Sequence, residues 1–222
     1  MDPADGPEGF MVELAEEALT RAGYRVQFKV TPWTRALGDM DSGAANAVVG
    51  IYFAQARQRK YVVPAEDLGV SANAIYVAAG SSWKYSRPAS LESMVLATIA
   101  DYDYGELNAY IAQALKENSP RVQVMFGNGA LEKNLKKLVA GRVTALVEDR
   151  VVVAYVARRM GFLGRIRSAG DVNPENPAGV AFSPRDPRAA EYARALSEGI
   201  EKLRASGELR KVLQRYGVAD WK

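Results

Sequence analysis

The stretch NAVVGIYFAQARQRKY, residues 46–61, indicates how the chain folds and where it could hold a ligand. Its apolar run 47–50 is too short for a helix and is bounded by glycines, which predicts a buried strand. Tyr52 and Phe53 follow at the carboxyl end of that strand, where open α/β sheets place their ligands. Arg57 comes four residues after Phe53, and its planar guanidinium suits two-point capture of a carboxylate. A basic surface loop after a core strand is the alternative interpretation.

A second stretch, GRVTALVED at residues 141–149, has the same plan as GAANAVVG at residues 43–50. In both, a glycine and three further residues precede a short apolar run. A segment with a helical pattern comes before each glycine, at 35–40 and at 131–139. The chain therefore has the pattern of two similar α/β units, although a repeat this short can also arise by chance.

The two strand ends carry opposite charges. Arg57 follows the first strand, whereas Glu148 and Asp149 stand at the end of the second. A cleft between two such units would hold a zwitterion, with its carboxylate at the arginine and its cationic group at the acids.

Composition narrows the classes of function. The chain has 222 residues, 48% of them hydrophobic and 25% charged, which is enough for two lobes of about 100 residues each. The net charge is +3 and basic residues are interspersed with acids, so we expect no nucleic-acid partner. No run of about 20 apolar residues predicts a membrane span. The chain has no Cys and no His, which excludes disulfides and removes the commonest general base, and we expect neither metal nor cofactor.

The remaining pattern alternates helices and strands. Helices are predicted at 10–22, 34–40, 106–117, 130–140, 149–160, 186–205 and 208–216, and further strands at 24–30, 73–79, 95–100, 121–126 and 179–183. This order predicts an α/β protein with a discontinuous first lobe, 1–80 and 178–222, and a second lobe at 84–174. The hinge crossings are expected near 80–86 and 174–180, and two crossings would let a cleft close on a ligand.

Loops next to the predicted strands supply further candidate ligand contacts. Trp33, at a strand-to-helix turn, could line a pocket or fill the core. Residues 127–129, Gly-Asn-Gly, come before a helix whose free N–H groups could bind an anion, or they form an ordinary permissive loop. The loop candidates are Tyr102, Tyr104, Asn128 and Gly129.

Six segments in order resemble the family 3 solute-binding proteins of bacterial ABC importers, the polar amino-acid type with a type II periplasmic-binding-protein fold. They are PWTRA at 32–36, SGAANAVVG at 42–50, ARQRKY at 56–61, YDYGE at 102–106, GRVTALVED at 141–149 and LRASGELRKVLQRYGV at 203–218. The likeness runs from about Gly9 to Val218. It implies two lobes, each a mixed sheet flanked by helices, with a cleft between them.

The resemblance also implies roles for particular residues. In that family an arginine after the third strand of lobe one clamps the ligand's α-carboxylate, and Arg57 stands at that place. An acidic residue after the matching strand of lobe two takes the α-ammonium, which corresponds to Asp149 with Glu148 beside it. Aromatic residues at the positions of Trp33 and Tyr52 often line the pocket.

The chain departs from the family pattern around the expected carboxylate site. Ala54 stands where a threonine usually helps to hold the carboxylate, and Ala56 replaces the usual glutamate before the arginine. Asn46 and Thr144 replace aspartates that are common before the two strands. The carboxylate-binding set is therefore thinner than usual, and a ligand other than a standard amino acid is a plausible cargo.

The N-terminal part also departs from the family, whose first strand lies inside the sheet of lobe one. Residues 1–8, MDPADGPE, predict a polar loop, and they lack the basic and apolar regions of a signal peptide. We therefore expect the first strand of lobe one to be missing here, and the natural protein to start upstream with that strand and a signal peptide. This would place it in the periplasm.

These features favour a monomeric, non-enzymatic binding protein. It would capture a small zwitterionic or carboxylate ligand and deliver it to the permease of an ABC importer in the membrane. A ligand-sensing domain of a signalling protein is the first alternative. An enzyme resembling cyclohexadienyl dehydratases, with Glu148 or Asp149 as acid or base, is the second.

Overall fold

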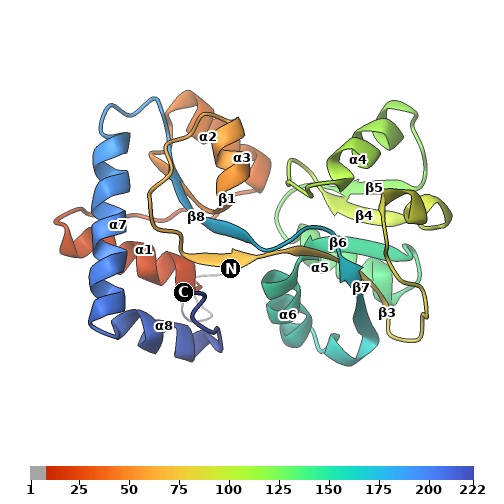
Figure 1. The fold of residues 1–222 in the computed structure, drawn as a ribbon. Coiled ribbons are helices and arrows are strands. Elements are labelled where there is room, and N and C mark those ends of the chain that lie inside the picture. The colour runs from red at the N-terminus through yellow and green to blue at the C-terminus, as the bar shows by residue number, and fades with distance from the viewer. Residues whose placement is uncertain (1–8) are drawn as a thin grey trace. The chain divides into compact units, whose positions relative to one another are not determined.

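A computed structural model describes residues 9–222, so the loop expected at 1–8 lies outside the described residues. Contacts divide the chain into two compact units (Figure 1). Unit 1 comprises the described residues up to Thr31 together with Arg35–Val70 and Asn176–Lys222. Unit 2 comprises Pro32–Thr34 and Ser71–Glu175. Each unit has its own sheet and its own core.

Unit 1 contains a three-stranded sheet in the order β1-β8-β2, formed by β1 (Ala47–Tyr52), β8 (Asn176–Phe182) and β2 (Gly69–Ser71). β1 runs antiparallel to β8, from Ala47 opposite Phe182 to Tyr52 opposite Ala178. The predicted strand at 47–50 is present, but its predicted complete burial is wrong. Val48 and Ile51 are buried and Val49 packs partly against the core, whereas Ala47 and Gly50 are exposed.

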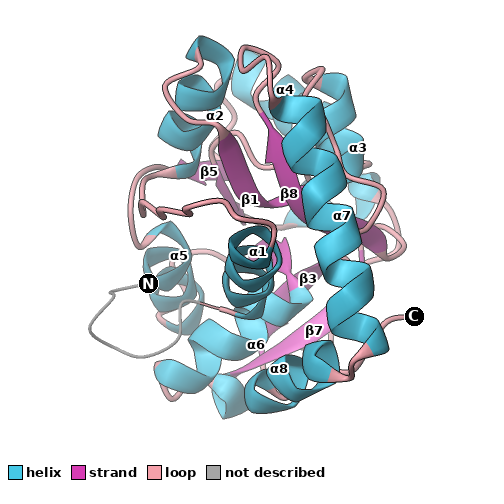
Figure 2. Ribbon diagram, turned by 90° about the vertical axis from the view of Figure 1, so that its left-hand side faces the viewer, coloured by secondary structure: helices cyan, strands magenta, loops and turns pink. Residues whose placement is uncertain are grey.

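Five helices complete unit 1: α1 (Phe10–Arg21), α2 (Trp33–Ser42), α3 (Phe53–Gln58), α7 (Ala189–Ala205) and α8 (Glu208–Tyr216), although the first two residues of α2 group with unit 2. The apolar stripe that predicts a helix at 10–22 is the buried face of α1, and Leu14 on that face is fully buried. α1 packs against α7 (Figure 2). Gly199 of α7 makes this approach close, because a Cβ at that position would lie 2.6 Å from the Cβ of Ala18.

The strand predicted at residues 24–30 is wrong. These residues carry no strand pairing, although Val26 and Phe28 pack partly against the core of unit 1 and Val30 is 57% exposed. Alternating apolar residues report that one face of an extended segment is covered. A strand also needs a neighbouring backbone to bond to, and this segment pairs with no strand of the described chain.

Unit 2 contains a five-stranded sheet in the order β5-β4-β6-β3-β7. Its strands are β3 (Asn73–Ala78), β4 (Leu96–Ile99), β5 (Val122–Met125), β6 (Ala145–Asp149) and β7 (Ile166–Asp171). β4 is parallel to both β5 and β6, whereas β3 is antiparallel to β6 and β7. The helical elements are α4 (Leu107–Lys116), α5 (Ala130–Val139), α6 (Arg150–Arg159) and the short 3-10 helices η2 (Pro88–Ser93) and η3 (Leu163–Arg165).

Residues 71–80 belong to unit 2, whereas the sequence-based division assigned them to the first lobe. β3 lies inside the sheet of unit 2, between β6 and β7. Apart from Pro32–Thr34, the chain therefore enters unit 2 at Val70–Ser71 and leaves it at Glu175–Asn176. The polar break at 80–90 has the composition of a linker, but it follows β3 within unit 2. Composition alone does not show with which strands β3 pairs.

Two glycine-to-alanine substitutions in helices should have opposite effects on stability. In Gly199→Ala the new methyl group would overlap Ala18, and overpacking typically costs about 1–3 kcal/mol, against a gain in helix propensity of about 1 kcal/mol. We expect a lower melting temperature. Gly38→Ala in α2 has nothing within 4 Å of the new Cβ, so only the gain in propensity applies.

Urea denaturation of both variants beside the wild-type protein measures these effects. A Gly199→Ala protein as stable as the Gly38→Ala protein would contradict the close packing of α1 against α7.

Candidate ligand-binding residues

The carboxyl ends of three neighbouring strands meet at one edge of the unit 2 sheet. β4 lies between β5 and β6 and is parallel to both, so all three end at the same edge. The loop after β4 carries Tyr102, the loop after β5 carries Asn128 and Gly129, and β6 ends at Asp149. Chain direction therefore brings these predicted site residues to one edge of unit 2.

Asp149 ends β6 and caps α6. Its Oδ1 accepts hydrogen bonds from the backbone N–H groups of Val151, at 2.8 Å, and Val152, at 3.2 Å. The carboxylate thus satisfies two of the free N–H groups at the helix start, which explains why α6 begins here. The sequence predicted the helix and the charge of this residue but not the cap.

Glu148 differs from the expectation of direct ligand contact, because its side chain is only 1% exposed. Its Oε1 accepts a hydrogen bond from the backbone N–H of Asp149 at 2.8 Å, and its Oε2 has no partner among the described residues. Burial raises the pKa of the Glu148 carboxyl to about 8. The hydrogen bond from the Asp149 N–H acts in the opposite direction, but its effect is smaller. Glu148 is therefore mostly uncharged at pH 7.

Two aromatic side chains of the predicted set come together in unit 2. The rings of Trp33 and Tyr102 meet edge-on with centroids 5.7 Å apart, and Trp33 Nε1 donates to the backbone oxygen of Asp101 at 3.1 Å. Burial, followed by the charges of Glu148 and Asp149, raises the pKa of Tyr102 above its usual range. Tyr102 thus lies within electrostatic reach of both acids.

Asp101 is a residue that the sequence-based candidate set lacked. Its Oδ2 accepts a hydrogen bond from Thr34 Oγ1 at 2.6 Å, and its backbone has a φ of 60°. A non-glycine residue rarely adopts this left-handed conformation. No sequence signal distinguishes this aspartate from Asp103 two residues later, so only the structure identifies it.

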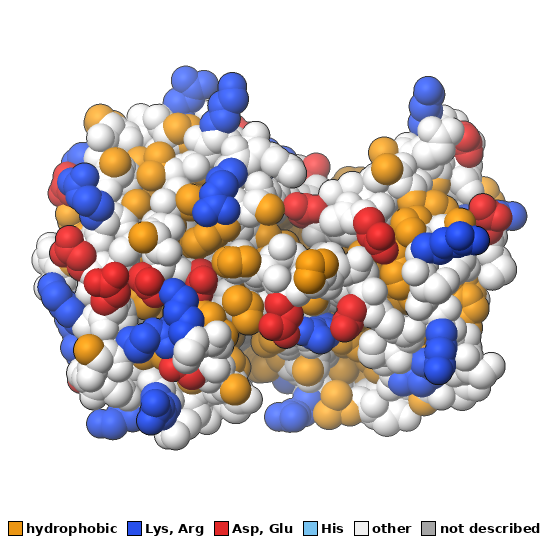
Figure 3. Space-filling view, viewed as in Figure 1, with side chains coloured by type: hydrophobic (Ala, Val, Ile, Leu, Met, Phe, Trp, Pro, Cys, Tyr) orange, Lys and Arg blue, Asp and Glu red, His pale blue; other side chains and the backbone are white. Residues whose placement is uncertain are grey.

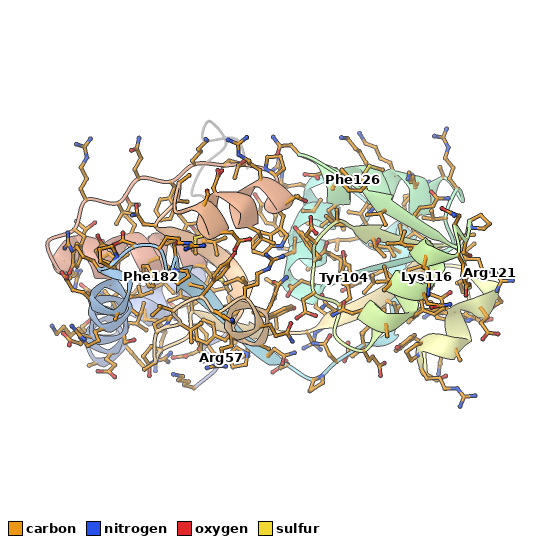
Figure 4. The ribbon with its side chains drawn as sticks, turned by 90° about the horizontal axis from the view of Figure 1, so that it is seen from above. Arg57, Tyr104, Lys116, Arg121, Phe126 and Phe182 are labelled. Atoms are coloured by element: carbon orange, nitrogen blue, oxygen red, sulfur yellow. The ribbon has the colours of Figure 1, made fainter. Side chains whose placement is uncertain are left out.

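Two aromatic residues of the predicted set lie in the cores instead. Tyr104 is 2% exposed, and its hydroxyl accepts a hydrogen bond from the backbone N–H of Ile99 at 2.8 Å (Figure 4). Phe53 is 3% exposed and packs in unit 1. Both side chains are closed to solvent, so they support the walls of their units. Tyr52, at the end of β1, is half-buried.

The loop before α5 is exposed and open. Gly127 has a φ of 79° and Gly129 a φ of 67°, conformations that favour glycine, and Gly129 caps α5. Asn128 is exposed, and its backbone oxygen accepts a hydrogen bond from Lys133 Nζ at 3.1 Å. Phe126, which the sequence analysis did not select, is 65% exposed at the start of this loop (Figure 4).

Arg57 lies on α3 of unit 1 with an exposed side chain (Figure 4). Its guanidinium carbon lies 5.7 Å from the centroid of the Phe53 ring, which supports the side chain by a cation–π contact. Among residues 9–222, Arg57 forms no ion pair. The strand β1 and the helix after it therefore present a cation that unit 1 does not neutralise.

The sequence profile of bacterial extracellular solute-binding proteins, family 3, matches residues 1–219. The chain belongs to this family. The family assignment confirms both the suspected resemblance and the predicted α/β fold class of the type II periplasmic binding proteins. No curated protein matches the sequence significantly.

Solved structures share the fold at low sequence identity. A histidine kinase sensor domain with similarity to periplasmic binding proteins has a TM-score of 0.76 and 21% identity, covering 97% of this chain and 88% of that one. An ancestral arginine-binding protein bound to arginine has a TM-score of 0.74 and 17% identity, with 97% and 90% covered. The arginine-, lysine-, histidine-binding protein ArtJ from Geobacillus stearothermophilus has a TM-score of 0.73 and 16% identity, with 94% and 85% covered.

The described surface was compared with the features typical of nucleic-acid, metal and membrane binding. Basic and acidic side chains are interspersed over the face that Figure 3 shows, without the continuous basic patch typical of nucleic-acid binding. Within residues 9–222, no cluster of three or more acidic side chains could hold a metal ion. No helix in the same part of the chain is both long and apolar enough to cross a membrane.

The buried Glu148 should make stability depend on pH. Its pKa is raised by folding, so the folded chain holds a proton that the unfolded chain releases between about pH 4.5 and about pH 8. The stabilisation is complete below this window and is lost as the pH rises through it. This one-proton difference makes the free energy of unfolding fall by about 1.4 kcal/mol per pH unit within the window, and we expect that dependence to disappear in Glu148→Gln.

Urea denaturation at several pH values between 5 and 8 measures the slope. Glu92→Gln, the same change at an exposed position in η2, is the control and should follow the wild-type profile. Parallel profiles for the wild-type and Glu148→Gln proteins would contradict the buried, protonated state.

Proposed function

We propose that the chain is a solute-binding protein that holds a small zwitterionic, amino-acid-like ligand between Arg57 of unit 1 and Asp149 of unit 2. The observation that supports it is the exposed guanidinium of Arg57, which unit 1 leaves without an ion pair, in a chain of the solute-binding family. Asp149 supplies the opposite charge at the carboxyl end of β6. Each charge follows a strand end, where α/β sheets place ligands.

The two poles divide the ligand's charges between the units. The guanidinium of Arg57 can donate two parallel hydrogen bonds to a carboxylate, and Phe53 beneath it limits its motion. Oδ1 of Asp149 is engaged in the helix cap, and its carboxylate attracts an ammonium group. Trp33 and Tyr102 would border the ligand on the side of unit 2, and Tyr52 on the side of unit 1.

Family membership supports the cellular role in this proposal. The ligand would be captured in the periplasm and carried unchanged, by a monomer, to the permease of an ABC importer. Similar folds bind arginine in the ancestral protein and arginine, lysine or histidine in ArtJ, which favours amino acids as cargo. No catalytic step is assigned to either acid.

A thermal-shift screen tests the function directly. The purified protein is heated with common amino acids, opines, polyamines and small carboxylates. A ligand at a hundredfold excess over its Kd stabilises the folded state by about 2.7 kcal/mol, a shift of roughly 5–10 °C for a chain of this size. No shift with any compound would contradict a small-molecule binding role. Turnover of prephenate by the purified protein, measured separately, would support the enzyme alternative.

Arg57→Ala should weaken binding of the zwitterion found in that screen. Loss of a charge-assisted hydrogen bond pair costs about 1.5–3 kcal/mol, so the Kd should rise about tenfold to a hundredfold. Arg210→Ala, which removes an exposed arginine of α8 that forms no ion pair in the described chain, is the matched control. Asp149→Asn keeps an oxygen for the cap of α6 and removes the charge, so it should weaken the same ligand without unfolding the helix.

Isothermal titration calorimetry gives each Kd. Equal affinities of the wild-type and Arg57→Ala proteins would refute Arg57 as the carboxylate pole.

A ligand sensor is the second candidate, because the histidine kinase sensor domain shares the fold over 97% of this chain. Transport and sensing both require a ligand bound by Arg57 and Asp149, so a binding measurement does not distinguish the two functions. In the transport case, the ligand-loaded protein stimulates ATP hydrolysis by an amino-acid importer of its organism in proteoliposomes. A sensor domain leaves that rate unchanged.

A further inference from the structure

Glu148 has a buried oxygen that no group of the described chain satisfies. Its Oε2 lacks a hydrogen-bond partner, whereas its Oε1 accepts the backbone N–H of Asp149. Buried polar atoms without a partner are rare and costly, so this carboxyl calls for an explanation beyond packing. Glu148 directly precedes Asp149 in β6. Asp149 is the anionic residue that would hold the ligand's cationic group in the proposed function, on which this inference rests.

The titratable groups that interact electrostatically with Glu148 are one acid and two tyrosines. Asp149 of β6 is the one charged group of the described chain that acts on its pKa. Tyr102 after β4 and Tyr76 of β3 both have pKa values that the charges of Glu148 and Asp149 help to raise. From α5, Asn134 is fully buried and donates to the backbone oxygen of Thr98, while Glu132 adds a further negative charge near Tyr102.

The basic residue nearest in sequence is already engaged. Arg150, at the start of α6, forms ion pairs with Glu175 at 2.6 Å and with Asp171 of β7 at 3.4 Å. It is not among the groups that set the pKa of Glu148. The compensating positive charge is therefore absent from this part of the described chain.

A ligand cation at Asp149 would supply that charge. An opposite charge within about 4–6 Å favours the ionised form of a carboxyl and lowers its pKa by about 1–3 units. The O–H bond of Glu148 would then break, its electron pair would stay on the carboxylate, and its proton would pass to solvent. The buried Glu148 carboxylate would then add a second negative charge behind that of Asp149, without touching the cation itself.

We propose that Glu148 is a positioning residue that makes unit 2 select a cationic group: it holds the main chain of Asp149 and releases its own carboxyl proton when that group binds. Ligands with an ammonium or guanidinium group gain affinity from this release. Ligands that present a neutral group to Asp149 gain none. Their affinity for the wild-type protein is therefore independent of the state of Glu148.

Proton release makes affinity for cations rise with pH. Because the pKa of free Glu148 is about 8, the rise should extend up to about that pH and reach at most tenfold per pH unit for one proton. Above it the carboxyl is already ionised and the profile becomes flat. A purely structural Glu148 would give no such profile.

The test uses agmatine and L-arginine as probes on the complete protein. Agmatine has a guanidinium that stays charged at all pH values used and carries no carboxylate for Arg57. Carbon-13 NMR of glutamate-labelled protein follows the Glu148 carboxyl, which is assigned by its absence in Glu148→Gln. We expect a midpoint near pH 8 without ligand and a midpoint about 1–3 pH units lower with excess agmatine.

Variants separate the charge from the hydrogen bond. Glu148→Gln keeps an acceptor for the Asp149 N–H, so it should bind agmatine with a flat pH profile. Glu148→Met removes the acceptor as well and should bind more weakly at every pH. Glu92→Gln should keep the wild-type profile, because this acid is exposed on η2.

The outcomes also separate this inference from the proposed function. A Glu148 midpoint near pH 4.5 without ligand, a midpoint that neither probe moves, or an unchanged pH profile in Glu148→Gln overturns the inference. If agmatine lowers the midpoint but L-arginine and other zwitterions do not bind, the inference holds and the two-pole function fails. If L-arginine binds through Arg57 while the Glu148 midpoint stays fixed, the function holds and the inference fails.

Discussion

Unit 2 depends on the direction of β4, which lies between β5 and β6 and runs parallel to both. Parallel neighbours end at the same sheet edge, so the loops after β4 and β5 and the start of α6 emerge together. If β6 ran the opposite way, Asp149 would lie at the far edge from Tyr102. The candidate site is set first by strand direction and only then by the side chains that the strand ends carry.

Local patterns predicted much of the secondary structure. The glycines before β1 and β6 and the apolar periodicity of α1, α5 and α7 are properties of short segments, and the structure contains all five elements. The failures at residues 24–30 and 71–80 concern pairing. An alternating pattern reports a covered face, but the backbone that covers or bonds it lies far away in sequence, and no residue type marks it.

The sequence indicated which charged residues follow the strand ends, but not how deeply each of them is buried. Arg57 and Asp149 were selected because each follows a short apolar strand. Arg57 is exposed and Asp149 partly exposed in the structure, and their role in ligand binding stays a prediction. β6 is buried on both faces, since the successive residues from Ala145 to Glu148 are all buried, and only its last residue, Asp149, is partly exposed. Sequence places a strand end only to within a residue or two, which leaves open which acid is buried. For the same reason the sequence did not distinguish Tyr104, which is buried, from Tyr102 as a candidate ligand contact.

Unit 1 is assembled from both parts of a divided chain, since β1 pairs with β8 and α1 packs on α7, whose Gly199 is fitted to Ala18. Unit 2, apart from three residues, is one continuous segment. Domains generally fold as units, and those encoded earlier fold first during synthesis. On a ribosome, unit 2 can complete its sheet while α1 and β1 still wait for partners that have not been made. The apolar face of α1 then stays uncovered until α7 has been made, so it needs protection from aggregation before the chain is finished.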